Sequence, residues 1–250
     1  MKDINFKVIV IAFFLTFTTG KIFASVQINA TRLIYPATER EITLQLTNVG
    51  TGPVLMQSWI DDGDTDAKPQ DAKAPFLLTP PIFRLDEKKG QTIRIIFTGA
   101  NLPSDRESIF WFNALEIPAL PEDKSKNYLQ IALRNRLKLF YRPSNLLISL
   151  EQAVKKVIWS LDIDKSGNCE LVINNPSPYY VSYTKVEILG KKSKDLIDGF
   201  MIRPFSEKRV DIKKFSASSG ALKVKYIWMN DFGPGPSFEA DLKKTQTNSN

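Results

Sequence analysis

The sequence predicts an all-β protein made of two antiparallel β-sandwich domains. Short runs rich in Val, Ile, Thr, Phe and Tyr alternate with clusters of Gly, Pro, Asn and Asp, and helical periodicity is almost absent. The break Arg142-Pro143-Ser144-Asn145 divides these runs into two sets. Each set has about the number of strands that one immunoglobulin-like domain needs.

The N-terminal residues 1–24 have the order of a secretory signal peptide. Lys2 and Lys7 precede an apolar run from Val8 to Phe17, and small residues follow. The run is about half the roughly 20 residues that a membrane span requires. We therefore expect export and cleavage after Ala24, with an N-terminal anchor helix as the less favoured alternative and no membrane insertion of the mature chain.

The first set of strands should form a domain over residues 25–145. Glu41–Thr47 shows the clearest pattern, because its apolar side chains alternate with polar ones and so mark a half-buried strand. The predicted strands are Val26–Tyr35, Glu41–Asn48, Val54–Asp61, Phe76–Thr79, Ile82–Leu85, Gln91–Phe97, Ser108–Ile117 and Tyr128–Phe140.

The second set should form a domain over residues 146–250. Proline- and glycine-rich turns at 175–178 and 233–236 separate its strands, and the tail from Lys243 onward is polar. The predicted strands are Val157–Ile163, Cys169–Asn174, Val181–Leu189, Phe200–Ile202, Glu207–Ile212, Leu222–Met229 and Phe238–Lys243.

Composition excludes several classes of function. The single cysteine, Cys169, permits no intrachain disulfide, and the absence of histidine removes the commonest general base and neutral metal ligand. The net charge of +7 comes without an RNP or zinc-finger pattern, so nucleic acid is not an expected partner. No phosphate-binding or dinucleotide motif follows a strand. We expect no enzyme, no cofactor and no metal, and we interpret the acidic residues between Asp61 and Asp66 as a solvated loop because a calcium loop's glycine and closing glutamate are missing.

The segment from Asn127 to Phe140 carries the main candidate for binding. Leu129, Ile131 and Leu133 share one strand face with Asn127, and cations follow at Arg134, Arg136, Lys138 and Arg142. An ordinary core strand would show the same alternation. An unusually long strand whose other face also packs would instead leave this ladder free for the extended chain of a partner.

Two cations from different strands are candidates for binding a terminal carboxylate. Arg32 and Lys138 would supply a planar two-point donor and a point charge. Lys138 lies five residues after Leu133, so regular alternation puts it on the opposite face unless a bulge intervenes. Glu107, Arg142 and Asp231 stand in polar breaks and are candidates for an interdomain ion network.

Several stretches in order resemble a known family, the PapD-like periplasmic chaperones of the chaperone–usher pilus pathway. Leu102-Pro103-Ser104-Asp105-Arg106-Glu107-Ser108 with Phe110, Phe112, Asn113 and Ile117-Pro118 fits the family signature, with Ala114 as a mild departure. The supporting stretches are Gln57–Ile60, Thr79–Pro81, Leu129–Leu133, Lys138–Pro143, Asn175–Tyr180 and Asn230–Gly233.

The resemblance implies two immunoglobulin-like domains in an L-shape and a non-enzymatic role in the periplasm. The chaperone would lend a strand to pilus subunits, which lack one, and deliver them to the outer-membrane usher. It assigns Asn127, Leu129, Ile131 and Leu133 to the donor strand, Arg32 and Lys138 to the subunit's C-terminal carboxylate, and Glu107, Arg142 and Asp231 to the interdomain network. The positions that match the usher-docking surface are Leu55, Thr79, Pro80, Pro81, Ile82 and Ile117.

Further expectations follow from the same resemblance. The connection from Pro118 to Asn127 is short, as in the branch of the family that serves rod-like pili, and the family's frequent second-domain disulfide cannot form here. A dimer that caps its own apolar ladder is plausible. The competing hypotheses are a secreted structural subunit or adhesin, and an exported hydrolase.

Overall fold

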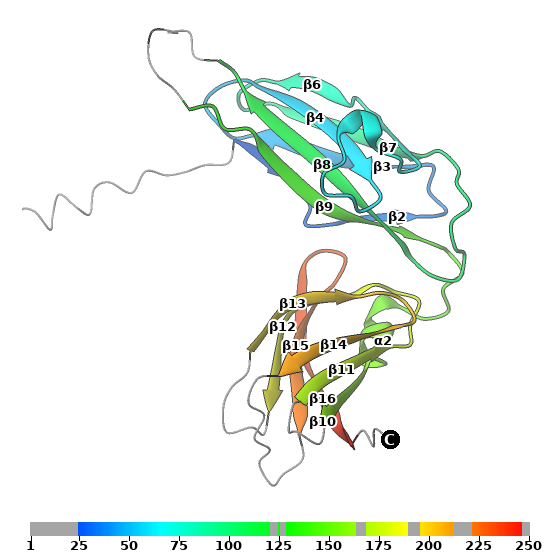
Figure 1. Ribbon diagram of the computed structural model, residues 1–250. Coiled ribbons are helices and arrows are strands. Elements are labelled where there is room, and N and C mark those ends of the chain that lie inside the picture. Colours follow the sequence, from blue (N-terminus) through cyan, green and yellow to red (C-terminus); the bar gives the residue numbers. More distant parts are fainter. Residues whose placement is uncertain are drawn as a thin grey trace, which may run out of the picture.

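The structure is a computed structural model and describes residues 25–120, 125, 129–163, 169–189, 196–212 and 222–246. Strands dominate these residues and form two units in sequence, with β1 to β9 in the first and β10 to β16 in the second (Figure 1). Figure 1 shows the units one above the other, joined at the right of the view. The predicted all-β class with two sandwich-like domains is therefore confirmed.

One layer of the first unit is a four-stranded antiparallel sheet. Its order is β1(Val26–Ile28), β3(Glu41–Asn48), β7(Gly90–Phe97) and β5(Phe76–Thr79). The apolar residues of β3 and β7 meet directly, since Leu44 opposes Ile93 and both are buried. This is the half-buried alternation that the sequence predicts.

The second layer of the first unit is a five-stranded sheet. Its order is β2(Leu33–Pro36), β9(Leu133–Arg142), β8(Ser108–Pro118), β4(Val54–Asp61) and β6(Ile82–Leu85). Only β2 runs parallel to its neighbour, β9, while the other pairs are antiparallel. The core lies between the layers, where Met56 and Phe112 are fully buried.

The predicted strand Val26–Tyr35 is wrong, because the chain divides it between the two layers. β1 pairs with β3 in one sheet, and β2 pairs with β9 in the other. Val26 and Leu33 are both buried in the same core although they are seven positions apart. A straight strand would place them on opposite faces, so burying both requires a crossing between the layers. Arg32 lies at the end of that crossing.

The second unit is organised around a strand that belongs to both of its halves. The sheet order is β13(Leu196–Ile202), β12(Val181–Leu189), β15(Lys223–Met229), β16(Pro234–Gln246), β10(Ile158–Ile163), β11(Cys169–Asn175) and β14(Ser206–Ile212). β16 is antiparallel to β15 as far as Asp241 and parallel to β10 from Leu242. The core includes Trp159 and the buried Cys169.

A short helix, α2(Leu150–Lys155), begins the second unit and was not predicted. Ser149 accepts a hydrogen bond from the backbone N–H of Gln152, whose side chain accepts one from the N–H of Ser149. This capping box, together with the burial of Ala153 and Val154, holds the helix in place. The Ser-x-x-Gln spacing was the sequence signal that pointed to it.

Candidate functional site

The donor ladder lies mostly outside the regular sheet. β9 begins at Leu133, five residues later than the predicted strand, because its last partner on β8 is Glu116 and β8 ends at Pro118. Leu129, Ile131 and Leu133 are 84%, 58% and 44% exposed. An apolar series this open is the opposite of a core strand. Asn127, the remaining predicted ladder residue, lies outside the described residues.

The strand that follows the ladder has one edge without a neighbour. β8 covers one edge of β9 along its whole paired length, whereas β2 covers the other only from Leu139 to Arg142. No strand within the described residues pairs with the second edge between Leu133 and Lys138. Such an edge presents backbone donors and acceptors to which an extended chain can add.

The register of β9 decides on which face Lys138 lies. Its pairing with β8 runs without a shift from Tyr141 to Leu133. Leu137 and Leu139 face the core, so Leu133 belongs to the core face and Lys138 to the opposite one. Since there is no bulge, the anchor and the ladder use different faces of one strand.

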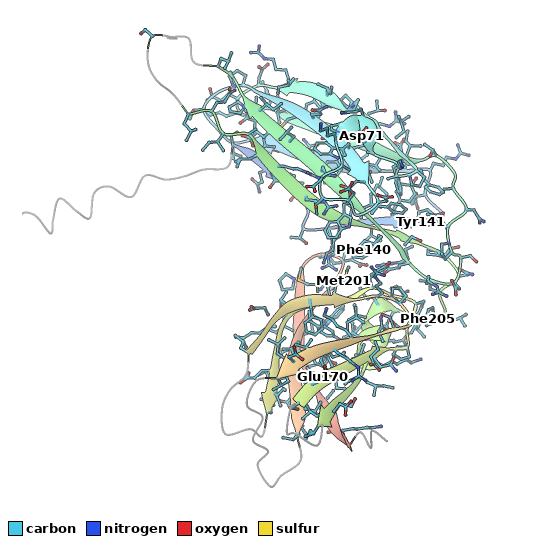
Figure 2. The ribbon with its side chains drawn as sticks, viewed as in Figure 1. Asp71, Phe140, Tyr141, Glu170, Met201 and Phe205 are labelled. Atoms are coloured by element: carbon cyan, nitrogen blue, oxygen red, sulfur yellow. The ribbon has the colours of Figure 1, made fainter. Side chains whose placement is uncertain are left out.

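Arg32 and Lys138 meet in a pocket between the two units. The pocket has a volume of about 460 Å³. Trp111 also lines it from the first unit, while Ser182, Met201 and Met229 are among the lining residues of the second. Figure 2 shows Phe140 and Met201 on the facing sides of this junction. Arg32 and Lys138, which the sequence offered as candidates for one cleft, thus line the same pocket.

Three cations line this pocket; Arg136 pairs with Asp61, whereas no described carboxylate binds Arg32 or Lys138 directly. Among the described residues neither takes part in an ion pair, and the Nε of Arg32 has no hydrogen-bond partner. The Nη1 of Arg32 donates to the backbone oxygen of Met229 at 3.5 Å. Burial lowers the pKa of Arg32, and burial together with the charge of Arg32 lowers the pKa of Lys138. An anion of carboxylate size would compensate both charges.

Trp111 and Ser182 are pocket residues that sequence reasoning missed. Trp111 pairs directly with Lys138, and the guanidinium of Arg136 lies 4.4 Å from the centre of its ring. Ser182 is 4% exposed, and its hydroxyl has no hydrogen-bond partner among the described residues. Only the alternation of β12, where Val181 and Tyr183 face the core, indicates that Ser182 points the other way.

The predicted interdomain ion network forms. Arg142 donates through Nε to Glu107 at 2.7 Å and through both terminal nitrogens to Asp231 at 2.7 and 2.8 Å. Glu107, 3% exposed, also accepts from the backbone N–H of Tyr180 at 2.9 Å. Burial raises the pKa of Glu107 against the opposing effect of Arg142. Burial lowers the pKa of Arg142, but the two carboxylates raise it by more, so the pKa of Arg142 lies above its ordinary value.

Aromatic side chains reinforce this junction. The guanidinium of Arg106 lies 4.8 Å from the ring centre of Phe205, and the rings of Phe140 and Tyr180 are 5.7 Å apart. Figure 2 places Phe205 at the side of the second unit that faces the first. These contacts and the ion network hold the two units at a defined angle.

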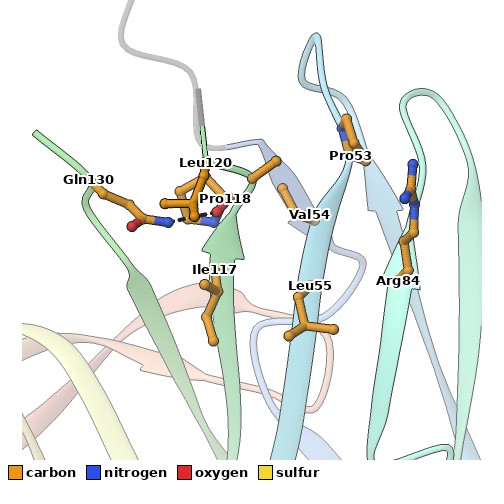
Figure 3. A pocket seen from close by; sticks show the side chains of 9 residues that line it. Pro53, Val54, Leu55, Arg84, Ile117, Pro118, Leu120 and Gln130 are labelled. Atoms are coloured by element: carbon orange, nitrogen blue, oxygen red, sulfur yellow. Dashed lines mark hydrogen bonds between the residues drawn. The ribbon is translucent and has the colours of Figure 1, made fainter. Parts of the chain in front are cut away.

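An apolar patch occupies the far end of the same five-stranded sheet. Leu55 pairs directly with Ile117 across β4 and β8, and Leu55 and Ile82 are 44% and 55% exposed. Leu55 and Ile117 line a hollow of about 470 Å³. Leu120 and Gln130 are among its other lining residues and lie at the end of β8 and before β9 (Figure 3). Thr79, Pro80 and Pro81 link β5 to β6 and do not line this hollow.

The interpretation of the acidic loop was wrong for one residue. Asp61 is fully buried and accepts hydrogen bonds from Arg136 at 2.5 Å, from Asn113 at 2.8 Å and from the N–H of Gly63 at 2.8 Å. It ties the outer face of β4 to that of β9, whereas Asp62, Asp64 and Asp66 are exposed. The described part of the chain contains no cluster of metal-ligating side chains and no helix of sufficient length and hydrophobicity to span a bilayer.

Comparison with known proteins identifies the family. Residues 25–147 match the Pili and flagellar-assembly chaperone, PapD N-terminal domain, and residues 152–240 match the Pili assembly chaperone PapD, C-terminal domain. The chaperone protein FimB/FhaD of Bordetella pertussis is 41% identical over 225 residues, covering 88% of each chain.

Solved structures give the same result. The probable fimbrial chaperone YadV of Escherichia coli K12 is 38% identical over 84% of this chain and 87% of its own. The crystal structure of YadV matches 88% of this chain and all of its own with a TM-score of 0.74. The SafB chaperone of Salmonella enterica, solved in complex with SafA pilin, is 27% identical with a TM-score of 0.67 over 90% of this chain and 99% of its own. These matches do not support a structural subunit or a hydrolase, and the chain belongs to the PapD family of periplasmic pilus-assembly chaperones, which are not enzymes.

Proposed function

We propose that this chaperone holds a pilus subunit by lending it residues 129–133 and the open edge of β9 as a missing strand. The apolar ladder enters the subunit's groove, and the subunit's last strand pairs with the backbone of β9. The subunit's terminal carboxylate then meets Arg32 and Lys138. The SafB–SafA complex shows that a related chaperone binds a pilin.

A single observation carries this proposal. The exposed ladder runs directly into an unpaired strand edge, and that edge leads to the buried Arg32 and the half-buried Lys138, which form no ion pair with a described residue. Apolar surface, open backbone and unbalanced charge are each unfavourable in a free protein. One extended chain with a free C-terminus would cover the apolar surface, pair with the open backbone and balance the charge. Its carboxylate, bound by the two cations, would fix the register of the pairing.

We further propose export to the periplasm by residues 1–24, with cleavage after Ala24, and a boundary between the domains at residues 145 and 146. The boundary is supported by the end of β9 at Arg142 and the start of α2 at Leu150. The predicted signal peptide lies outside the described residues.

For the usher, we propose the apolar patch of Leu55, Ile82 and Ile117 as the docking surface, with Thr79, Pro80 and Pro81 beside it. Exposed aliphatic side chains on a sheet that keeps its shape favour a protein interface. Before a subunit arrives, a second copy of the chain is a candidate to cover the ladder.

The test is capture of subunits in the periplasm. Tagged mature protein is purified from cells that express pilus subunits, and its partners are identified by intact mass. We expect a stoichiometric small subunit with the wild type and none with Lys138→Glu, because a carboxylate replaces its binding cation. Lys225→Glu changes an exposed lysine of β15 and serves as the control with the same charge change. Normal capture by a folded Lys138→Glu protein contradicts the anchor.

A further inference from the structure

A buried carboxylate stands at the start of the first strand. Glu116, on β8, is 5% exposed. One of its oxygens accepts a hydrogen bond from the hydroxyl of Ser25, and the other accepts one from the backbone N–H of Val26 at 3.2 Å. Ser25 is the residue that directly follows the proposed cleavage site. The carboxylate therefore contacts the two residues that become the beginning of the processed chain.

No cation among the described residues balances the charge of Glu116. It forms no ion pair with any described residue. Its neighbours across the sheet are Met56 on β4 and Leu133 on β9, and both side chains are apolar. A carboxylate held away from water without a cation is costly, and hydrogen bonds from neutral donors offset only part of that cost.

We propose that Glu116 is the binding site for the α-ammonium group that signal cleavage creates on Ser25. The inference rests on the proposed cleavage after Ala24. Hydrolysis of the Ala24–Ser25 peptide bond consumes one water and leaves a carboxylate on Ala24 and an amine on Ser25, which takes up a proton at neutral pH because its ordinary pKa is about 7.7–8.0. The uncharged amide nitrogen of Ser25 thus becomes a cation beside Glu116.

The structure holds Ser25 where this ion pair can form. The carbonyl oxygen of Ser25 accepts hydrogen bonds from the N–H groups of Val49 at 2.7 Å and Gly50 at 3.2 Å. A Cβ on Gly50 would stand 2.6 Å from the Cβ of Ser25, so glycine is what allows the two segments to lie this close. The hydroxyl and the carbonyl oxygen of Ser25 are therefore both held by hydrogen bonds before cleavage creates the charged amine.

The proposed ion pair between Glu116 and the amine of Ser25 has a structural consequence for the donor site. β1 is only three residues long, and it lies at the edge of its sheet. Glu116 also pairs with Leu133, where the donor ladder leaves the sheet. Processing would thus secure the first strand at the position from which the ladder extends.

The test is a cycle of four purified proteins. One pair of chains begins at Ser25, with Glu116 or with Glu116→Gln, and the other pair has Gly-Ser-Gly placed before Ser25. Glutamine keeps the shape of the side chain and removes its charge, and the extension moves the ammonium away. The equilibrium constant of unfolding is measured in urea for all four.

We expect Glu116→Gln to raise the unfolding constant on the order of 10- to 100-fold in the chain that begins at Ser25, as for a hydrogen bond to a charged group that loses its charged partner. In the extended chain the same substitution should change it less than about 3-fold. Equal effects in both backgrounds would show that Glu116 only accepts neutral hydrogen bonds, and they would overturn the proposal.

A second readout is the pKa of the terminal amine. It is measured from the rate at which the amine is acylated at a series of pH values. Pairing with Glu116 should raise the pKa of the amine above its ordinary range of about 7.7–8.0, and Glu116→Gln should return it there. The stabilisation is then present below about pH 8 and is lost as the pH rises through the raised value. A terminal amine whose pKa stays in its ordinary range contradicts the proposed ion pair.

Failure of the processing proposal is recognised separately. The intact mass of protein recovered from the periplasm shows whether the chain begins at Ser25. A different first residue contradicts the proposed cleavage site. The comparison of the four proteins tests the ion pair between Glu116 and Ser25 separately, because the first residue of each of those chains is defined.

Discussion

Lys138 and Arg32 show at the scale of single residues how a binding site is kept at a cost to the free protein. Both cations are withdrawn from water, and burial lowers both pKa values. Glu107 and Asp231 are near Arg32 but already bind Arg142. The free chaperone is therefore destabilised by the charges that the subunit's carboxylate would neutralise.

The lowered pKa of Lys138 predicts a pH dependence of binding. A bound carboxylate favours the charged ammonium, so binding takes up a proton at any pH near the pKa of free Lys138, which lies below 10.5. Affinity should fall as the pH rises from 7 towards 10, by at most tenfold per pH unit. Isothermal titration with a subunit peptide that ends in a free carboxylate measures this.

The control for that prediction is Lys138→Arg. A guanidinium keeps its charge across this pH range. The affinity of the variant for the same peptide should therefore change little between pH 7 and 10. A parallel decline in both proteins would mean that another group titrates.

β9 illustrates at the scale of an element how one strand serves two purposes. Its second half, from Leu139 to Tyr141, is a normal core strand flanked by β8 and β2. Its first half keeps one neighbour, and the ladder before it has none within the described residues. The same apolar face continues from the core of the first unit into solvent, so an added subunit would extend that core.

Two identical substitutions on this face should have different effects. Leu129→Glu, at a position 84% exposed and outside the sheet, should leave the free energy of unfolding within about 0.5 kcal/mol and should abolish subunit capture. Leu137→Glu, at a position 8% exposed, should unfold the first unit because it buries an unpaired charge. Urea unfolding and the periplasmic pull-down measure both. If Leu129→Glu also unfolds the chain, the residue is part of the core and not of the donor ladder.

The ion network around Arg142 sets the geometry of the whole molecule. It joins a residue near the end of β9 to Asp231, 89 positions away in sequence, in the turn between β15 and β16. The pocket of Arg32 and Lys138 takes its opposite wall from β12, β13 and β15. The orientation of the two units therefore determines whether that pocket exists.

Arg142→Ala should lower the free energy of unfolding by about 3–5 kcal/mol, because Glu107 would remain buried without its cation. Arg209→Ala is the matched control. Arg209 pairs with three carboxylates where Arg142 pairs with two, but it is half exposed, so the loss of its side chain should cost less than about 1 kcal/mol. Calorimetry should resolve separate transitions of the two units for Arg142→Ala. A loss no larger than that of Arg209→Ala would show that the network does not join them.

Much of the fold could be predicted from the sequence because its signals are local. Alternation and turn residues predicted the bounds of β3, β4, β5, β6 and β12 as they occur in the structure. The spacing of Leu129, Ile131 and Leu133 predicted a ladder on one face, and the family signature predicted which charged residues belong together. The strand bounds and the ladder depend only on the order of neighbouring residues, whereas the grouping of the charged residues came from the resemblance to the family.

Tertiary structure alone decided where pairing starts and stops. The division of Val26–Tyr35 between two layers, the start of β9 at Leu133 and the face of Lys138 all follow from the strand that lies alongside. The burial of Asp61 and the contact of Glu116 with Ser25 depend on side chains from distant segments. A strand's own sequence specifies which residues alternate, but its neighbours determine which edge stays open and which charges remain without a partner.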